Sequence, residues 1–139
     1  MAVNLKEPFL MSQCAGREMI RRKRGKIVNI ASQAGIVALE KHVAYSSSKA
    51  GIIGMTKVLA LEWARYNINV NAISPTVVFT ELGREIWKGE AGEKMKSRIP
   101  KRRFVYTEEV ATVALFLACD ASNMITGANI IIDGGYTIQ

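Results

Sequence analysis

Three short runs of branched and apolar residues, separated by long segments with helical spacing, constrain the fold of this chain more than any other feature. The runs cover residues 26–31, 69–73 and 129–132. A short apolar run of this kind is typical of a strand that is buried on both faces. Strands joined by long helices form a parallel sheet with helices on both faces. We therefore predict an α/β fold with a small parallel sheet.

The segments around these runs have the periodicity and the boundary residues of helices. Gly25 supplies the end of the first helix, and Thr107 is placed to cap the last. Residues 76–101 are polar, and we expect them to be irregular with one short helix. The predicted helices cover residues 2–22, 43–66, 81–87 and 107–118.

Two glycines lie inside the second predicted helix, where each lowers helix stability by about 1 kcal/mol relative to alanine. The loss of helix stability at Gly51 and Gly54 must therefore be offset by a favourable contact elsewhere. We expect the close approach of another backbone to supply it.

Size and composition exclude several classes of protein. The chain has 139 residues, the length of one domain, and 49% of them are hydrophobic, which is enough for a sizeable core. No apolar run reaches the ~18 residues that cross a bilayer, and the first residues lack the pattern of a signal peptide. Cys14 and Cys119 lie in apolar helical patterns without metal-ligand spacing. We expect them to be buried, reduced thiols in a cytoplasmic protein with no metal site.

The chain is basic, with a formal net charge of +7, and much of the excess lies near the end of the first predicted helix. Such a cluster can bind nucleic acid. However, no aromatic residues interleave with it, and the carboxyl end of a helix attracts cations through the helix dipole. We therefore favour a solvated helix end and expect no nucleic-acid partner. The cluster consists of Arg17, Arg21, Arg22, Lys23, Arg24 and Lys26.

Tyr45 and Lys49 lie one turn apart on the second predicted helix, so they share a face. A tyrosine is a poor base at neutral pH because its pKa is about 10, but a neighbouring ammonium favours the phenolate and makes proton transfer to or from a substrate hydroxyl feasible. Ser32 follows the first strand, at the carboxyl edge where open α/β sheets bind ligands. The Tyr-x-x-x-Lys pattern alone is common. The serine, the order of strand and helix, and the small residues around the pair favour a catalytic interpretation.

Short motifs cover nearly the whole chain in a fixed order. Residues 27–32 have the sequence Ile-Val-Asn-Ile-Ala-Ser, residues 45–51 Tyr-Ser-Ser-Ser-Lys-Ala-Gly, and residues 69–73 Asn-Val-Asn-Ala-Ile, with Thr126-Gly127 and Asp133-Gly134-Gly135 further on. In this set and order the chain resembles the short-chain dehydrogenase/reductase family. The resemblance implies the C-terminal part of a doubly wound, Rossmann-like parallel sheet.

The same resemblance implies roles for particular residues. Tyr45 matches the family's catalytic acid/base, and Lys49 matches the lysine that binds the nicotinamide ribose and favours the tyrosine phenolate. Ser32 matches the serine that positions the substrate carbonyl or hydroxyl. Asn4 matches the helix asparagine that supports a proton relay through water, although an asparagine on a helix surface is the alternative.

The family's Pro-Gly-x-x-x-Thr segment corresponds here to Pro75-Thr76-Val77-Val78-Phe79-Thr80. The resemblance implies that this segment from Pro75 onward binds the nicotinamide, with a backbone contact to its carboxamide at Val78 and a side-chain contact at Thr80. Thr76 stands in the glycine position. Its Cβ restricts the backbone, so the sequence leaves the geometry of this loop in question.

The loop sequence also narrows the substrate. Residues 74–83, Ser-Pro-Thr-Val-Val-Phe-Thr-Glu-Leu-Gly, are followed by Trp87 and by Arg-Ile-Pro at 98–100. This pattern resembles the xylulose reductase and threitol dehydrogenase branch, which implies oxidation or reduction of a CH–OH or C=O group in a small polyol or ketose. The alternatives are that these residues only pack, or that the chain is similar to 3-oxoacyl thioester reductases. His42 is either a substrate contact or an exposed loop residue.

The phosphate-binding glycine-rich turn of this fold lies between its first strand and first helix, and this sequence has no such turn. Residues 1–139 therefore resemble a partial domain that lacks the half binding most of the cofactor, NAD or NADP. The residue that selects between the two falls in that half. We expect either an oxidoreductase that works with the missing half or a non-catalytic remnant that associates with related subunits.

The missing half has consequences for assembly. The strand at residues 26–31 is left with one unpaired edge, and some helix faces lose their cover. Family members commonly pair through helices like those predicted at residues 2–22 and 43–66. We therefore expect a homo-oligomer whose other partner is a small-molecule alcohol or carbonyl substrate, with no membrane contact.

Overall fold

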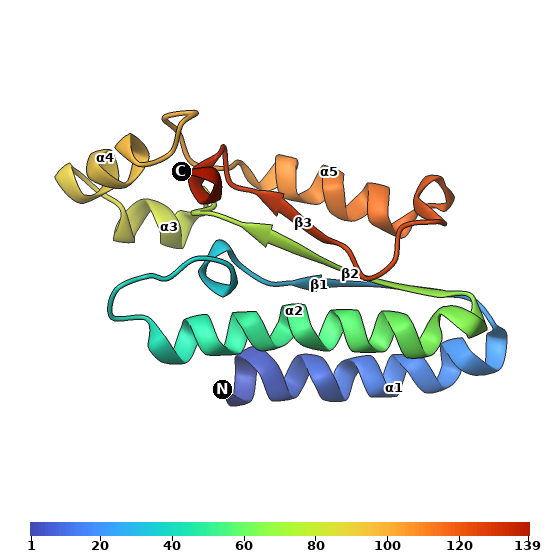
Figure 1. The fold of residues 1–139 in the computed structure, drawn as a ribbon. Coiled ribbons are helices and arrows are strands. Elements are labelled where there is room, and N and C mark those ends of the chain that lie inside the picture. Colours follow the sequence, from blue (N-terminus) through green and yellow to red (C-terminus); the bar gives the residue numbers. More distant parts are fainter.

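The computed structural model describes residues 1–139 except the side chains of Leu82 and Arg84. Its centre is a parallel sheet of three strands, β1 (Gly25–Ile30), β2 (Ile68–Pro75) and β3 (Asn129–Ile132), in the order β1-β2-β3. Helices α1 (Glu7–Arg22) and α2 (Val43–Trp63) cover one face, and α5 (Thr107–Ala118) covers the other (Figure 1). The predicted α/β fold with helices on both faces is confirmed.

All three strands end on the same side of the molecule. The register pairs Ile30 of β1 with Ile73 of β2, and Pro75 of β2 with Ile132 of β3. The nitrogen of Pro75 faces β1, which has already ended, so its missing N–H removes little from the ladder. The first turn of α2, the start of the chain, and the short helices α3 (Glu81–Ile86) and α4 (Glu90–Ser97) lie near this carboxyl edge (Figure 1).

The core lies mainly between the sheet and α2. Ile52 and Leu59 of α2 are buried against Val70 and Ala72 of β2, each at most 6% exposed. Burial of one such side chain contributes about 1.5–3 kcal/mol. A second cluster joins Met95, Ile99 and Phe104 near the carboxyl edge.

Several element boundaries differ from those predicted. The first helix begins with a π-helical turn, Ala2–Lys6, and α2 ends in a 3₁₀ turn, Ala64–Tyr66. Residues 76–101 contain α4 as well as α3, so the prediction of one helix was wrong; the periodicity of α4 is confined to eight residues. Helix α5 starts at Thr107, and the residue that caps it is Tyr106, whose backbone N–H donates to the Glu109 carboxylate at 2.8 Å. The predicted Thr107 cap is therefore one residue too late.

The expected contacts of the two helix glycines are only partly present. A Cβ on Gly51 would lie 2.9 Å from Leu5 Cδ2, so a side chain rather than a backbone approaches it. A Cβ on Gly54 would meet nothing within 4 Å. The glycine at 54 is therefore not explained by packing within this chain.

The prediction of buried cysteines was wrong. Cys14 and Cys119 are both exposed and free. The periodicity of α1 places Cys14 on the face that turns away from the sheet, and Cys119 follows the last residue of α5. Apolar neighbours in the sequence did not distinguish a core-facing from an outward-facing helix surface.

Candidate active site at the carboxyl edge of the sheet

Ser32 lies directly beyond β1 and begins a short 3₁₀ turn, Gln33–Gly35. Its side chain is buried, and its Oγ accepts a hydrogen bond from the Ala34 N–H at 3.1 Å. The turn is held against α2 by Gly35, where a Cβ would come within 2.7 Å of the Lys49 carbonyl carbon. A glycine is thus required where the serine loop meets the helix.

Tyr45 and Lys49 lie in the first two turns of α2. The helix begins after His42, whose Nδ1 lies 2.7 Å from the Glu40 carbonyl oxygen. Ser48 is buried and donates to the Tyr45 carbonyl oxygen at 2.6 Å, which fixes the backbone of this turn. The Tyr45 side chain is 38% exposed, so its ring is accessible from the carboxyl edge.

The Lys49 ammonium lies beside the tyrosine. Its Nζ is 5.7 Å from the centroid of the Tyr45 ring and donates to the Ile30 carbonyl oxygen at 2.9 Å. Partial burial lowers the pKa of Lys49 because the charged form loses solvation. The structure therefore brings Tyr45 and Lys49 together at the end of β1, as the helical spacing predicts. In the described part of the chain, no hydrogen bond joins Ser32 to Tyr45.

Asn4 lies in the π-helical turn that precedes α1 and is half-buried. This turn packs against α2, where Leu5 meets the Gly51 backbone. A single π-helical turn interrupts the regular α-helical hydrogen-bond pattern, and such turns are frequent at functional sites. The position of Asn4 at the carboxyl-edge end of α1 is consistent with its predicted role, and the role itself stays a prediction.

The backbone of the segment that follows β2 is held by hydrogen bonds to neighbouring segments. The Thr76 N–H donates to the Ile132 carbonyl oxygen at 3.0 Å, and Thr76 is not among the residues with positive φ. Threonine is therefore accommodated in the glycine position. Val78 forms a parallel bridge with Val105, and Thr80 caps α3 by accepting from the Gly83 N–H at 3.0 Å. Pro75, Val78 and Thr80 stay predictions as cofactor contacts.

Three buried side-chain oxygens next to these residues were given no role by the sequence. Gln33 Oε1, Ser46 Oγ and Thr76 Oγ1 are buried without a hydrogen-bond partner among the described residues. Gln33 and Thr76 follow the ends of strands and Ser46 follows Tyr45, and this placement is the only signal in the sequence that could have drawn attention to them. Buried, unpaired oxygens are uncommon in native proteins.

Over the part of the chain whose side chains are described, no three His, Cys, Asp or Glu residues are grouped so that they could hold a metal ion. Within the same residues, no helix is long and apolar enough to cross a membrane.

The parallel sheet, the helices on both of its faces and the polar groups at its carboxyl edge define a Rossmann-like α/β protein. The family model described as enoyl-(acyl carrier protein) reductase matches residues 1–137. The chain therefore belongs to this family, the short-chain dehydrogenases and reductases.

Individual relatives agree with this assignment. The chain is 65% identical over 139 residues to an NAD-dependent glycerol dehydrogenase of Listeria innocua. It is 53% identical over 139 residues to a D-threitol dehydrogenase of Mycolicibacterium smegmatis. Both matches include the whole of this chain, but only 55% of the first relative and 54% of the second. A crystal structure of a gluconate 5-dehydrogenase from Burkholderia cenocepacia, in complex with NADP and tartrate, superposes with a TM-score of 0.94 at 34% identity, over 100% of this chain and 55% of the other. The chain thus spans about half the length of the relatives it matches. The resemblance to the polyol branch is confirmed.

Proposed function

We propose that the chain forms the catalytic part of an NAD(P)-dependent oxidoreductase that acts on a CH–OH or C=O group of a small polyol or ketose. The observation that carries this proposal is the Lys49 ammonium, 5.7 Å from the Tyr45 ring at the carboxyl edge of the sheet. Family membership and the polyol-acting relatives support it. The chain spans about half of those relatives, so we propose the activity for a protein in which the remaining half is also present.

Tyr45 is the proposed acid/base. In the oxidative direction, its phenolate oxygen accepts the proton of the substrate hydroxyl as hydride leaves the same carbon; in reduction the phenol O–H returns a proton to the carbonyl oxygen. Lys49 stabilises the phenolate by its charge. Ser32 donates from its hydroxyl to the reacting oxygen and orients it toward Tyr45. Asn4, at the start of the paired helix, supports proton exchange with water.

The chemistry of the available donors fits the nicotinamide end of the cofactor, NAD or NADP. Lys49 has three N–H donors, one of which bonds the Ile30 carbonyl, so the others are available for ribose hydroxyls. Pro75, Val78 and Thr80 are the residues that would hold the nicotinamide. When bound, this ring accepts or donates the hydride. The given sequence has no glycine-rich turn of the kind that binds the pyrophosphate in this fold, so we propose only the nicotinamide end of the site for these residues.

A small polyol is the substrate class that the relatives support. The glycerol and threitol dehydrogenases act on short polyhydroxylated compounds by name. Near the carboxyl edge, Trp87 packs on Phe104 with their ring centroids 6.1 Å apart, so at least part of this loop pattern serves packing. His42 lies 6.4 Å from Tyr45 between ring centroids, close enough for its exposed ring to face a substrate.

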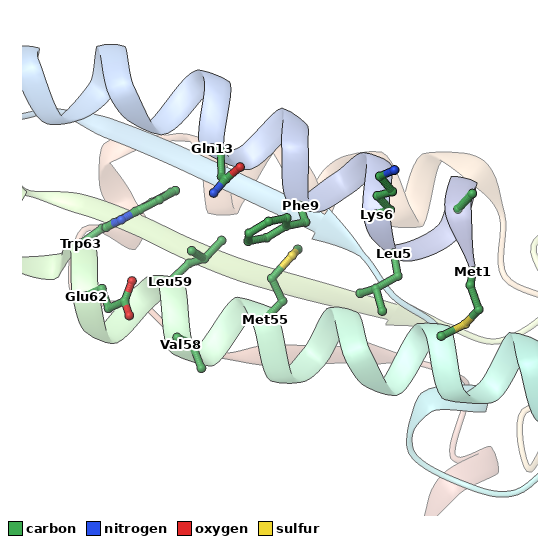
Figure 2. Close-up of a pocket in the computed structure, with 11 residues that line it drawn as sticks. Met1, Leu5, Lys6, Phe9, Gln13, Met55, Val58, Leu59, Glu62 and Trp63 are labelled. Atoms are coloured by element: carbon green, nitrogen blue, oxygen red, sulfur yellow. The ribbon is translucent and has the colours of Figure 1, made fainter.

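An apolar groove on the outer side of α1 and α2 supports a homo-oligomer. It encloses about 960 Å³, and its walls include Phe9, Met55 and Trp63 (Figure 2). It lies away from Tyr45 and Lys49. Val58 at its edge is 54% exposed, and Gly54 nearby faces open space. A second copy covering this groove would remove these surfaces from water.

The charges of the groove suit the same partner. Lys6 lies toward one end and Glu62 toward the other (Figure 2). A two-fold axis across the groove would place Lys6 of each copy near Glu62 of the other.

The two exposed, unpaired cysteines are consistent with a reducing compartment such as the cytoplasm.

The experiment completes the chain with the part of the glycerol dehydrogenase that lies outside its match and assays a panel of polyols with NAD⁺ and NADP⁺. We expect turnover of at least one short polyol and a loss of at least about 100-fold in Tyr45→Phe, the range of general acid–base catalysis. Tyr66→Phe, at the other end of α2, is the control. Turnover of an acyl thioester with indifference to every polyol would instead identify a 3-oxoacyl reductase.

A second candidate is a non-catalytic remnant of this family. Titration of the chain alone with NADH and NADPH, followed by fluorescence, separates the two. We expect binding no tighter than millimolar for the chain alone and tight binding for the completed protein. Tight binding without turnover of any alcohol or carbonyl would establish the remnant.

A further inference from the structure

A cavity of about 440 Å³ lies at the carboxyl edge of the sheet, separate from the groove between α1 and α2. Three segments line it: the loop that follows Ser32, the end of α4, and the turn that follows β3. Its walls therefore come from parts of this chain that are distant in the sequence. The lining residues are Val37, Ala38, Ser97, Arg98, Tyr136 and Gln139.

One wall of the cavity is the loop that joins Ser32 to the helix of Tyr45. The Val37 N–H donates to the Gln33 carbonyl oxygen at 2.9 Å, so this loop folds back on the turn that Ser32 begins. A substrate whose reacting oxygen is bound by Ser32 and Tyr45 has this loop beside it. The cavity is thus placed to receive the end of the substrate that does not react.

Arg98 supplies a positive charge to this cavity. None of the ion pairs among the described side chains includes it. Its backbone is held in place, since its N–H donates to the Met95 carbonyl oxygen at 3.1 Å and Gln139 Nε2 donates to its carbonyl oxygen. A guanidinium without a carboxylate partner keeps its N–H donors for an incoming anion.

The segment around this arginine adds to the charge. Residues 94–103 contain six Lys and Arg residues and no Asp or Glu. Two of the six are neutralised by ion pairs, Lys96 with Glu93 at 2.8 Å and Arg103 with Glu109 at 2.7 Å. The described ion pairs include none of the other four, so an excess of positive charge remains beside the carboxyl edge. Such an excess raises the local concentration of anionic ligands.

We propose that this cavity binds an anionic group, a carboxylate or a phosphate, at the end of the substrate that does not react, and that Arg98 recognises it. The inference rests on the proposed function and narrows its substrate class from neutral polyols to polyols that carry an acidic group. Arginine binds either group through two parallel N–H···O bonds, which a single hydroxyl oxygen cannot accept. The uncharged polar residues of the cavity can bond hydroxyls beside the acidic group; they are Ser97, Tyr136 and Gln139.

The first measurement observes Arg98 without turnover, in the chain completed with the remaining part of the glycerol dehydrogenase. The protein is labelled with ¹⁵N arginine, and the Nε–H peak of Arg98 is identified by its loss in Arg98→Gln. Threitol, threonate and threitol phosphate, which differ at one terminal group, are added in turn. We expect at least one of the two anions to move this peak and threitol to leave it in place. Movement by one anion alone identifies the group as carboxylate or phosphate, and movement by neither overturns the proposal.

The second measurement compares kcat/KM for the same three compounds in wild type, Arg98→Gln and Lys94→Gln. The matched control is Lys94→Gln, which removes the same charge from the same segment but lies outside the lining of the cavity. In wild type we expect an anion to be preferred over threitol by about tenfold or more, the effect of hydrogen bonds to a charged group. Arg98→Gln should lose this preference through a higher KM for the anion, and Lys94→Gln should keep it.

The outcomes separate this proposal from the proposed function. Turnover of threitol that equals or exceeds that of both anions in wild type would overturn the proposal and leave the proposed function standing. An equal loss of preference in Arg98→Gln and Lys94→Gln would also overturn it, because the effect would then come from the general charge of the segment. Absence of turnover with all three compounds, together with a shift of the Arg98 peak by an anion, would count against the proposed function alone.

Discussion

Replacing Gly35 by alanine tests how the serine loop is held against α2. The backbone conformation of Gly35 accepts alanine, since it is not among the glycines with positive φ. The added Cβ, however, would lie 2.7 Å from the Lys49 carbonyl carbon, 2.8 Å from the Ala50 nitrogen and 2.9 Å from the Lys49 oxygen. These are backbone atoms of a helix, which cannot rotate away as a flexible side chain can.

The loop and α2 must therefore separate, and overpacking of this kind costs about 1–3 kcal/mol. Gly54→Ala is the matched control, because its Cβ would meet nothing within 4 Å. In a helix interior the same change stabilises by about 1 kcal/mol. We expect the two variants to differ by about 2–4 kcal/mol in the free energy of unfolding.

Urea unfolding followed by circular dichroism measures this difference, at a protein concentration where sedimentation shows the monomer. Both variants should retain the wild-type dependence on urea, so that the midpoints report stability. A Gly35→Ala midpoint equal to or above that of wild type would refute the argument from close contact. If Gly54 faces a second copy, Gly54→Ala should also weaken self-association, which the same sedimentation experiment measures at higher concentration.

Three further outcomes follow from other parts of the structure. Asp133 accepts hydrogen bonds from the Gly135 N–H at 2.9 Å and from the Thr137 N–H and hydroxyl, both at 2.7 Å. Asp133→Asn should therefore destabilise the chain by about 1–3 kcal/mol and speed amide hydrogen exchange at Thr137. Equal exchange rates at Thr137 in the variant and wild type would contradict this. The hydrogen bond from Arg103 lowers the pKa of Glu109 from 4.5 in the unfolded chain to about 2 in the folded chain, so the ion pair stabilises the fold above the unfolded pKa and this stabilisation is lost as the pH falls through the folded pKa. The decrease in Tm between about pH 5 and pH 2 should therefore be shallower in Glu109→Gln than in wild type. Parallel plots of Tm against pH for the two proteins would disprove the linkage. Cys14 and Cys119 are exposed, so both should react with a thiol reagent in the native state; protection of either until unfolding would show that it is covered.

The roles of Ser32 and Tyr45 illustrate how far the sequence leads. Their order along the chain, one after a strand and one on the following helix, places both at the same edge of any parallel sheet. The sequence therefore locates the candidate site without coordinates. It does not tell how the side chains are directed, and in the structure the Ser32 hydroxyl bonds its own loop at the Ala34 N–H.

The helix surfaces show a different limit. The periodicity of α1 predicts a helix, yet it does not tell which stripe meets the sheet and which meets water, and Cys14 was assigned to the wrong one. Gly54 likewise has no neighbour in this chain. Both errors arise because a local pattern contains no information about the partner of each helix face.

By itself, the sequence determined the α/β class, the order of strands and helices, and the spacing of Tyr45 and Lys49, because these depend on the period of neighbouring residues. The tertiary structure decided where the Lys49 ammonium goes: onto the Ile30 carbonyl at the open edge of β1. These residues are separated by 19 positions, and their contact exists only because α2 returns across the end of β1. A long, flexible side chain takes the acceptor that the folded backbone leaves unpaired, and which acceptor that is follows from strand pairing rather than from local sequence.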